Sequence, residues 1–468
     1  MGSWIFVWAG IQSGDVSDAF HPEFSSVFLN GVRAILPLVA AGIAIVKIAL
    51  QLSSRKVGSR GVISPLSLLA IYGVIGVLAI PISPDWSVAL YWVALYLSVP
   101  LVLWAATWGP NSLEAISRII RVNWTIVIAI FVGLFAFGLL NLDLKEALSH
   151  PGDLVGCPNI GSWVSESSGV IRSSGVARFA AITGIIALTL GWKGNGFLRV
   201  VWFTVLLGAV VLILTTGSRG SLIAMLAGLP VVALLLGGKK TAFTIVGILV
   251  VLAPLAWTTN AHDTFLNGCI LRSWTPGSLP FAVQNPHGIP SQPLEEISES
   301  TSGPISASSI PSDSQPNDLK SPEAGLIPRG FFTLTGRTQI WNASWVYVKA
   351  SPIFGYGFQG DRLVLGTHIH NAGMQALFQT GFIGLIPFVA GVLLGWVFLV
   401  RLLRRINHLA EAHRILTIQA AGIFVFLTIR AIPESTGAFF GIDFILLGPI
   451  LVFLYAMDRN TPRSGING

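Results

Sequence analysis

The stretch 371–401, NAGMQALFQTGFIGLIPFVAGVLLGWVFLVR, carries no charged side chain before its last residue. A helix needs about 20 apolar residues to cross a hydrocarbon core ~30 Å thick, so this stretch is long enough to span a bilayer. Comparable apolar runs recur along the chain, which predicts an all-α polytopic integral membrane protein. We expect eleven transmembrane helices, near 30–52, 62–82, 87–108, 122–141, 175–192, 197–216, 219–237, 241–257, 371–401, 414–431 and 438–457.

The composition supports this class of protein. Of the 468 residues, 53% are hydrophobic and 10% are charged, whereas soluble globular domains carry about 25% charged residues. Residues 4–11 are apolar but too few for an ordinary span, so they form either a re-entrant segment or a tilted twelfth helix. Whether residues 1–29 cross the membrane is left open at this point. No basic segment precedes them, which is unlike a cleaved signal peptide.

The basic residues orient the expected spans. Cytoplasmic connections of membrane proteins carry an excess of Lys and Arg, and every basic cluster falls on one side when the spans alternate. We therefore interpret the net charge of +7 as a topology signal and expect no nucleic-acid partner. The clusters contain Arg55, Lys56, Arg60, Arg118, Arg121, Lys193, Arg199, Lys239, Lys240, Arg401, Arg404, Arg405, Arg414, Arg459 and Arg463.

This orientation divides the chain into three regions. Residues 1–257 form an N-terminal membrane region of about eight spans, residues 258–370 form one large periplasmic loop, and residues 371–468 form a C-terminal membrane region of about three spans. The middle of the loop, 290–325, is rich in Ser and Pro, and such a composition buries too little apolar surface to order itself. Its end, 338–350, predicts a helix that lies at the membrane interface.

That interfacial helix has an apolar face in helical spacing. Ile340, Trp341, Trp345 and Val348 fall on one side of it, and Ser351-Pro352 ends it. The two cysteines, Cys157 and Cys269, also fall on the outer side of the membrane. A disulfide between them is permitted there, and two separate thiols are the alternative.

Two arginines stand at expected helix starts on the outer side. Arg219 follows a Gly-Ser turn, and Arg337 lies between Gly336 and Thr338 at the start of the interfacial helix. Free N–H groups at a helix start attract anions, and paired guanidinium groups suit a pyrophosphate. The alternative for each is an arginine that anchors the protein at lipid headgroups. Arg430, also at the outer membrane edge, is a further candidate for a phosphate contact.

Two histidines precede the apolar stretch 371–401. His368 and His370 face the same way if their segment is extended and diverge if it is helical. His370 is followed by Asn371 at the expected helix start, where a neutral imidazole can take a proton from a hydroxyl. A metal site and a structural cap are the alternatives. Zinc needs three or four ligands, and no Cys/His/Asp cluster supplies the others, so we expect neither a metal nor a cofactor.

Several of these segments, in this order, resemble the O-antigen ligase/polymerase superfamily. They are Ser218-Arg-Gly-Ser-Leu, Gly336-Arg-Thr-Gln-Ile-Trp, Ile353-Phe-Gly-Tyr-Gly, His370-Asn371 and Leu377-Phe-Gln-Thr-Gly-Phe-Ile-Gly-Leu, and the similarity is close over roughly 200–400. The resemblance implies an inner-membrane enzyme, active at the periplasmic face, that transfers a preassembled glycan from undecaprenyl pyrophosphate. Among its members, the single large loop and the modest length favour a ligase whose acceptor is lipid A–core.

Within that interpretation, His370 is the expected catalytic base, and Arg219 and Arg337 hold the donor pyrophosphate without a metal. His368, Asn371, Arg430, Gly336 and Thr338 are candidates for supporting roles. A chain polymerase and a protein O-oligosaccharyltransferase of the same superfamily are alternatives. A transporter of lipid-linked oligosaccharide is an alternative from another class. Transporters more often carry ionisable groups within the membrane and internal repeats, whereas here the polar groups gather at one face.

Overall fold

A computed structural model describes residues 1–9, 24–53, 64–109, 111–140, 173–215, 218, 220–237 and 337–461. These residues belong to one of the two units into which the chain divides, Met1–Ser273 with Leu334–Gly468. Several predictions lie outside the described residues. They concern Arg219, Gly336, Cys157, Cys269, the expected span 241–257 and the Ser/Pro-rich segment 290–325.

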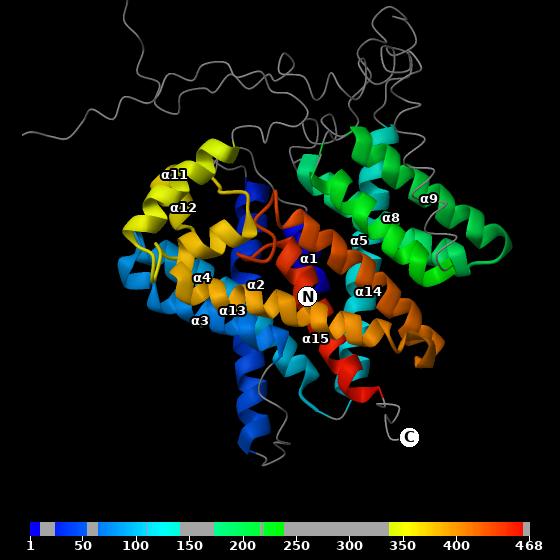
Figure 1. The fold of residues 1–468 in the computed structure, drawn as a ribbon, viewed down its shortest axis with the longest axis horizontal. Helices are drawn as coiled ribbons and strands as arrows, with labels where there is room; N and C mark the ends of the chain where they lie inside the picture. The colour runs from blue at the N-terminus through cyan, green and yellow to red at the C-terminus, as the bar shows by residue number, and fades with distance from the viewer. Residues whose placement is uncertain are drawn as a thin grey trace, which may run out of the picture. The chain divides into compact units, whose positions relative to one another are not determined.

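The described part of the chain is helical, without strands, as predicted (Figure 1). Its helices are α1 (Gly2–Ala9), α2 (Phe24–Ser53), α3 (Pro65–Leu78), α4 (Trp86–Thr107), α5 (Ser112–Leu140), α8 (Ser173–Lys193), α9 (Gly196–Thr215), Gly220–Gly237, α11 (Arg337–Ala350), α12 (Gly360–Leu365), α13 (Ala372–Leu403), α14 (Glu411–Arg430) and α15 (Ile442–Asn460). Eight of them are long and apolar enough to cross a membrane. The all-α polytopic fold is therefore confirmed.

The bounds of three helices differ from the expected ones, because hydropathy depends on composition and does not show where the backbone leaves the helical conformation. The expected span 62–82 is the 14-residue helix α3, which ends at Leu78 and is followed by a short 3-10 turn containing Pro81. The expected span 438–457 starts later, at Ile442, after a non-helical turn. The N-terminal apolar segment is the eight-residue helix α1, whose Trp4 and Ile5 are buried.

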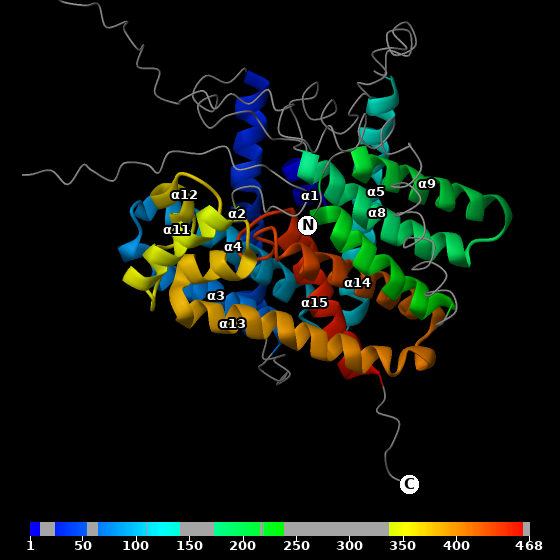
Figure 2. The same ribbon diagram turned by 45° about the horizontal axis from the view of Figure 1, so that its top comes forward.

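An aromatic cluster joins α3, α4, α13 and α15. Tyr96 of α4 stacks on Phe444 of α15 with ring centroids 4.2 Å apart, and Tyr72 of α3 lies 5.3 Å from Phe388 of α13. Both tyrosines are fully buried, so each hydroxyl needs a hydrogen-bond partner. Tyr72 donates to the carbonyl of Ala438 at 2.7 Å and Tyr96 donates to that of Gly437 at 3.1 Å. The core thereby fixes the turn that joins α14 to α15 (Figure 2).

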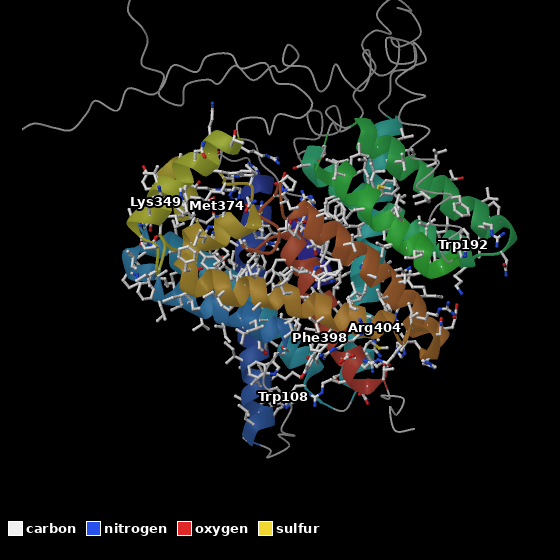
Figure 3. The ribbon with its side chains drawn as sticks, in the orientation of Figure 1. Trp108, Trp192, Lys349, Met374, Phe398 and Arg404 are labelled. Carbon is white, nitrogen blue, oxygen red and sulfur yellow. The ribbon has the colours of Figure 1, made fainter. Side chains whose placement is uncertain are left out.

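Lys193 and Arg405, which belong to predicted cytoplasmic clusters, lie at one end of the helices, whereas Arg178, Arg337 and Arg430 lie at the other. Lys193 at the end of α8 pairs with Glu411 at the start of α14 at 2.5 Å, and Arg405 after α13 pairs with Asp458 of α15. Figure 3 marks the two ends of α13 with Met374 and Arg404. The start of α13 and the end of α14 lie at the opposite end of the bundle, where the predicted site residues are found.

Candidate functional site

A break in α13 allows the segment after α11 to pack against this helix. Gly381 has φ 62° and ψ −166°, so the helix is interrupted there and two carbonyls before it lose their helical partners. The amides of Tyr356 and Gly357 donate to these carbonyls, on Phe378 and Gln379, at 2.8 and 2.9 Å. A Cβ on Gly381 would lie 2.0 Å from the carbonyl oxygen of Ile353, so the two segments meet only because this residue is glycine.

Helix α11 contacts the segment that carries the two histidines. Trp341 of α11 donates its indole N–H to the carbonyl of Ile369 at 2.8 Å, and Val348 is buried beside Ile369. Of the predicted apolar face of α11, Val348 is buried and Ile340 and Trp341 are half-buried against the protein, whereas Trp345 is 41% exposed. The buried Ser344 lies on the side that packs against the protein. Thr338 is exposed in the first turn of α11.

The turn 431–441, which we call the α14–α15 connection, organises the site. Asn371 caps α13 by accepting from the amide of Met374 at 2.8 Å, and its own amide donates to the carbonyl of Ile432 at 2.9 Å. The amide of Ala372 donates to the carbonyl of Ala431. Asn371 therefore has a structural role: it fixes the start of α13 against the α14–α15 connection.

Glu434 of this connection joins the two principal site residues. One carboxylate oxygen accepts from Arg337 at 3.2 Å, and the other lies 3.2 Å from Nδ1 of His370. Arg337 also donates to the carbonyl of Pro433 at 2.6 Å. Burial by itself raises the pKa of Glu434, but the hydrogen bond from His370 and the positive charge of Arg430 outweigh it and lower the pKa to about 2. Glu434 is thus ionised at neutral pH.

The ionised carboxylate determines which nitrogen of His370 can act as a base. A carboxylate only accepts hydrogen bonds, so Nδ1 of His370 must carry the proton that it shares with Glu434. In the neutral ring, Nε2 is then the nitrogen with the free electron pair. His370 also has φ 54°, a left-handed conformation that is uncommon for a residue other than glycine. Such strain is concentrated at functional sites in proteins.

A second carboxylate–imidazole pair lies beside the first. Nδ1 of His368 is 2.7 Å from Asp361 of α12, and the rings of His368 and His370 have centroids 5.6 Å apart. The residues 368–371 are not helical, and the two rings lie close together, although the left-handed backbone of His370 makes the segment other than regularly extended. Burial raises the pKa of Asp361, but the hydrogen bond and charge of His368 outweigh it and keep that pKa below its usual value.

A third cluster of charges joins α8, α14 and α15. Asp443 accepts from Arg178 at 3.1 Å and from Arg430 through its other oxygen. Nε of Arg430 lies 3.4 Å from the hydroxyl of Ser221, in the first turn of helix Gly220–Gly237. Buried ions are stable only when they are paired in this way. Arg430, expected to contact a phosphate directly, is 3% exposed and is held by Asp443.

The same helix brings the predicted Arg219 motif close to the α14–α15 connection. A Cβ on Gly220 would lie 2.9 Å from the ring of Pro433, the residue whose carbonyl holds Arg337. Gly220 directly follows Arg219 in the chain. Gly220, Arg337 and Pro433 come from distant parts of the sequence, and all three meet at the α14–α15 connection.

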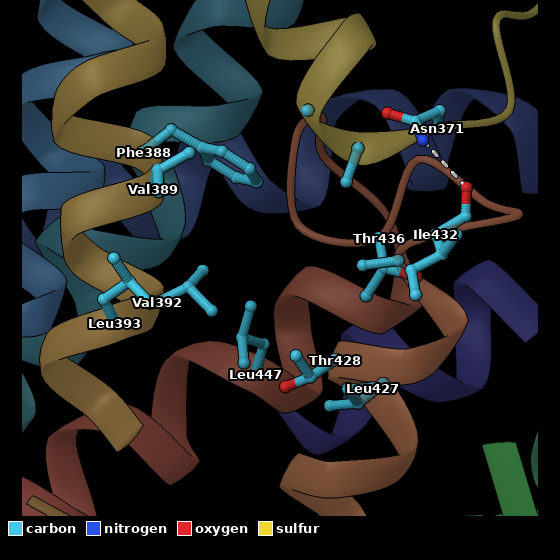
Figure 4. A pocket seen from close by; sticks show the side chains of 13 residues that line it. Asn371, Phe388, Val389, Val392, Leu393, Leu427, Thr428, Ile432, Thr436 and Leu447 are labelled. Atoms are coloured by element: carbon cyan, nitrogen blue, oxygen red, sulfur yellow. Dashed lines mark hydrogen bonds between the residues drawn. The ribbon is translucent and has the colours of Figure 1, made fainter. Parts of the chain in front are cut away.

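An apolar pocket of about 250 Å³ borders Asn371 (Figure 4). Phe388, Val389 and Val392 of α13 face Leu427 of α14 and Leu447 of α15 across it. Three polar side chains, Asn371, Thr428 and Thr436, also line it. Thr436 donates a hydrogen bond to Asp443 at 3.0 Å and so connects the pocket to the charged residues. Within the described ranges, His, Asp and Glu do not form groups of three or more that could hold a metal ion.

The structure brings His368, His370, Asn371, Arg337 and Arg430 to one end of the bundle. Sequence reasoning missed four acidic or basic residues that hold them: Glu434, Asp443, Asp361 and Arg178. A signal existed for Arg178, which is an ionisable residue inside an expected span, and such residues mark functional sites.

The fold and the side-chain geometry together define a polytopic membrane protein with a charged, partly buried cluster of side chains at one end of its helices. Residues 203–389 match the family model described as O-Antigen ligase. This match contains the Arg219, Arg337 and His370 motifs and ends before Arg430 and Glu434. It confirms the resemblance to the O-antigen ligase superfamily over this part of the chain and supports a glycosyltransferase of the O-antigen ligase/polymerase type. No curated protein matches the chain.

Proposed function

We propose that the protein is an O-antigen ligase. It transfers a preassembled glycan from undecaprenyl pyrophosphate to a sugar hydroxyl of lipid A–core at the periplasmic face of the inner membrane. The observation that carries this proposal is Glu434, which binds His370 and Arg337 through its two oxygens. One side chain thus sets the spacing between a base and an anion-binding group. The family match over 203–389 supports the same class of reaction.

In the proposed mechanism His370 acts as the general base. Nε2 accepts the proton of the acceptor hydroxyl as its oxygen attacks the anomeric carbon of the glycan. The bond between that carbon and the pyrophosphate oxygen breaks, and its electron pair stays on the pyrophosphate. Attack from the face opposite the leaving group inverts the anomeric configuration. The imidazolium formed on His370 is stabilised by Glu434, because an adjacent negative charge favours the protonated ring.

Arginines stabilise the leaving group. The guanidinium of Arg337 has five N–H donors, and the bonds to Pro433 and Glu434 use two of them. The remaining donors of Arg337 can bind the pyrophosphate, whose charge grows as the bond breaks. Arg219 is the second arginine that we propose for this role.

The apolar pocket beside Asn371 has the chemistry to accommodate the prenyl chain of the donor. Its lining is mostly aliphatic and aromatic, and Thr436 of the lining is hydrogen-bonded to Asp443 of the charged site. A lipid pyrophosphate has the same division between an apolar chain and a charged end. The pocket therefore supports a lipid-linked donor over a soluble nucleotide-sugar.

The experiment that tests the proposal uses purified protein in detergent with lipid-linked glycan, lipid A–core and excess EDTA. Formation of a covalent glycan–core product supports the ligase. Elongation of the donor without core modification identifies a polymerase instead, and transfer to protein identifies an O-oligosaccharyltransferase. A protein that makes no covalent product but moves the donor across proteoliposomes is a transporter. Activity that is lost in EDTA and restored by a divalent ion contradicts the metal-independent mechanism.

A further inference from the structure

Asp361 is the most deeply buried carboxylate of the site, and the mechanism above does not use it. It is 0% exposed and lies in the short helix α12 next to Gln359, whose φ is 63°. Gln359 and His370 are the described non-glycine residues with positive φ, and both flank the Asp361–His368 pair. Both a buried charge and a strained backbone conformation lower the stability of the folded protein. Asp361 and Gln359 therefore reduce stability at this position.

The polar atoms around this pair are incompletely satisfied. Nε2 of His368 and both side-chain polar atoms of Gln359 are buried without a hydrogen-bond partner, whereas Asp361 is also hydrogen-bonded by Gln375. Buried polar groups in proteins are almost always paired, and each exception calls for an explanation such as an ordered water or a catalytic role. The Asp361–Oδ2 bond to His368 is, in contrast, short and well formed at 2.7 Å.

The pair also contacts His370 through its ring. The ring centroid of His368 is 5.6 Å from that of His370 and 5.0 Å from that of Phe439 in the α14–α15 connection. Both histidines are held through Nδ1, His368 by Asp361 and His370 by Glu434. Each therefore presents Nε2 away from its carboxylate. The site contains two carboxylate–imidazole pairs, Asp361–His368 and Glu434–His370. The proposed general base uses only the second pair.

We propose that Asp361 and His368 form a positioning pair for His370. The ring of His368, fixed by Asp361 and Phe439, holds the ring of His370 in its left-handed backbone conformation. The carboxylate of Asp361, through His368, stabilises the imidazolium that His370 becomes when it takes the acceptor proton. This inference rests on the proposed function and adds to it a second residue pair acting through the general base, in the way that a buried carboxylate supports the histidine of a catalytic triad.

The test compares isosteric variants in the ligation assay. Asp361→Asn keeps an oxygen that accepts from His368 and removes only the charge. His368→Asn keeps an amide that donates to Asp361 and removes the ring beside His370. Asp458→Asn is the matched control, because Asp458 is a similarly buried carboxylate, paired with Arg405, at the opposite end of the helices.

Both test variants should lower kcat about tenfold with little change in the KM of the donor. This loss is smaller than the ~10²–10⁴-fold that a general base itself contributes to the rate. In the His370→Ala background neither substitution should lower the residual rate further, because residues that act as a unit are not additive. The acidic limb of the pH–rate profile should move to lower pH in Asp361→Asn. Asp458→Asn should leave the rate and the profile unchanged.

The ionisable groups around His370 are His368 from its own segment, Asp361 from α12, Arg337 from α11, Glu434 from the α14–α15 connection and Arg430 from α14. Equal losses of rate with and without His370, or losses that follow only protein yield, would overturn the positioning role. Wild-type activity in both variants would overturn it as well. A wild-type protein that forms no product in the same assay contradicts the proposed function instead.

Discussion

Glu434 has the largest influence on the chemistry of the site at the scale of single residues. Its carboxylate fixes Nδ1 of His370 as the protonated nitrogen and holds Arg337 at the same time. Because the pKa of Glu434 is lowered to about 2, it does not titrate between pH 5 and 9. A loss of activity as the pH falls through that range is therefore assigned to an imidazole, whose ordinary pKa is about 6.5.

Glu434→Gln should lower kcat by about 10²-fold, because the amide can present its N–H₂ to His370 and select the wrong tautomer. The acidic limb of the pH–rate profile should also move to lower pH, since the charge that favours the protonated ring is gone. Both effects are measured from ligation rates at pH 5 to 9. A profile whose limb stays in place in Glu434→Gln would show that the carboxylate does not act on His370.

Single substitutions also separate the roles of the base and the arginines. His370→Ala should lower turnover ~10²–10⁴-fold and leave donor binding nearly intact. Arg219→Ala and Arg337→Ala should weaken both, because they meet charge that is present in the bound donor and grows in the transition state. Arg→Lys should rescue only in part, since an ammonium lacks the bidentate geometry. His368→Ala should be milder than His370→Ala. Well-folded His370→Ala protein that ligates at the wild-type rate would contradict the base assignment.

The sequence was sufficient to single out His370 and Arg337 as candidate site residues, which the structure brings together at Glu434, but not to identify the residues that hold them. Glu434 lies about 60 residues after His370 in a short apolar-flanked turn and belongs to no motif by itself. Its importance follows from the packing of α14 and α15, which no local pattern encodes. Asp361 was missed for the same reason: only the fold shows that it is buried and paired with His368.

At the scale of elements, the break in α13 connects two of the sequence motifs. Hydropathy predicts one continuous span over 371–401, and α13 does extend from Ala372 to Leu403, but the backbone of Gly381 is not helical and interrupts it. The carbonyls freed by the break accept the amides of Tyr356 and Gly357. Irregular backbone inside a membrane protein is tolerated where it packs against protein in this way. The motif Ile353-Phe-Gly-Tyr-Gly and the motif that begins at Leu377 are thus hydrogen-bonded to each other.

Gly381→Ala should destabilise this hydrogen-bonded arrangement. The left-handed conformation of a residue with a side chain costs ~1–3 kcal/mol, and the added Cβ would lie 2.0 Å from the carbonyl of Ile353. The expected result is a lower Tm in detergent and a lower ligation rate. Gly42→Ala in α2 is the control, because a Cβ there meets no atom within 4 Å, and its Tm should be unchanged or higher. Equal Tm values for both variants would show that the break does not depend on glycine.

At the scale of the whole molecule, the candidate site lies at one end of the helices, and basic residues of the predicted cytoplasmic connections, such as Lys193 and Arg405, lie at the other end. Hydropathy and the positive-inside rule predict this separation from sequence, because both depend only on composition and alternation. The assembly of the site could not be predicted in this way. It brings together α8, α11, α12, α14, α15 and helix Gly220–Gly237, whose mutual packing is set by side-chain shape.

The orientation of the whole molecule is a prediction that exposed cysteines can test. In protein with Cys157→Ser and Cys269→Ser, Lys349→Cys introduces a thiol on α11 at the site end, and Asn407→Cys introduces one after α13 at the basic end. Both positions are exposed, so they differ in side of the membrane rather than in burial. If the basic end is cytoplasmic, a membrane-impermeant maleimide added to intact spheroplasts should label Lys349→Cys, and should label Asn407→Cys only after lysis. The reverse pattern would place the His370–Glu434 site in the cytoplasm, where a periplasmic transfer to lipid A–core is impossible.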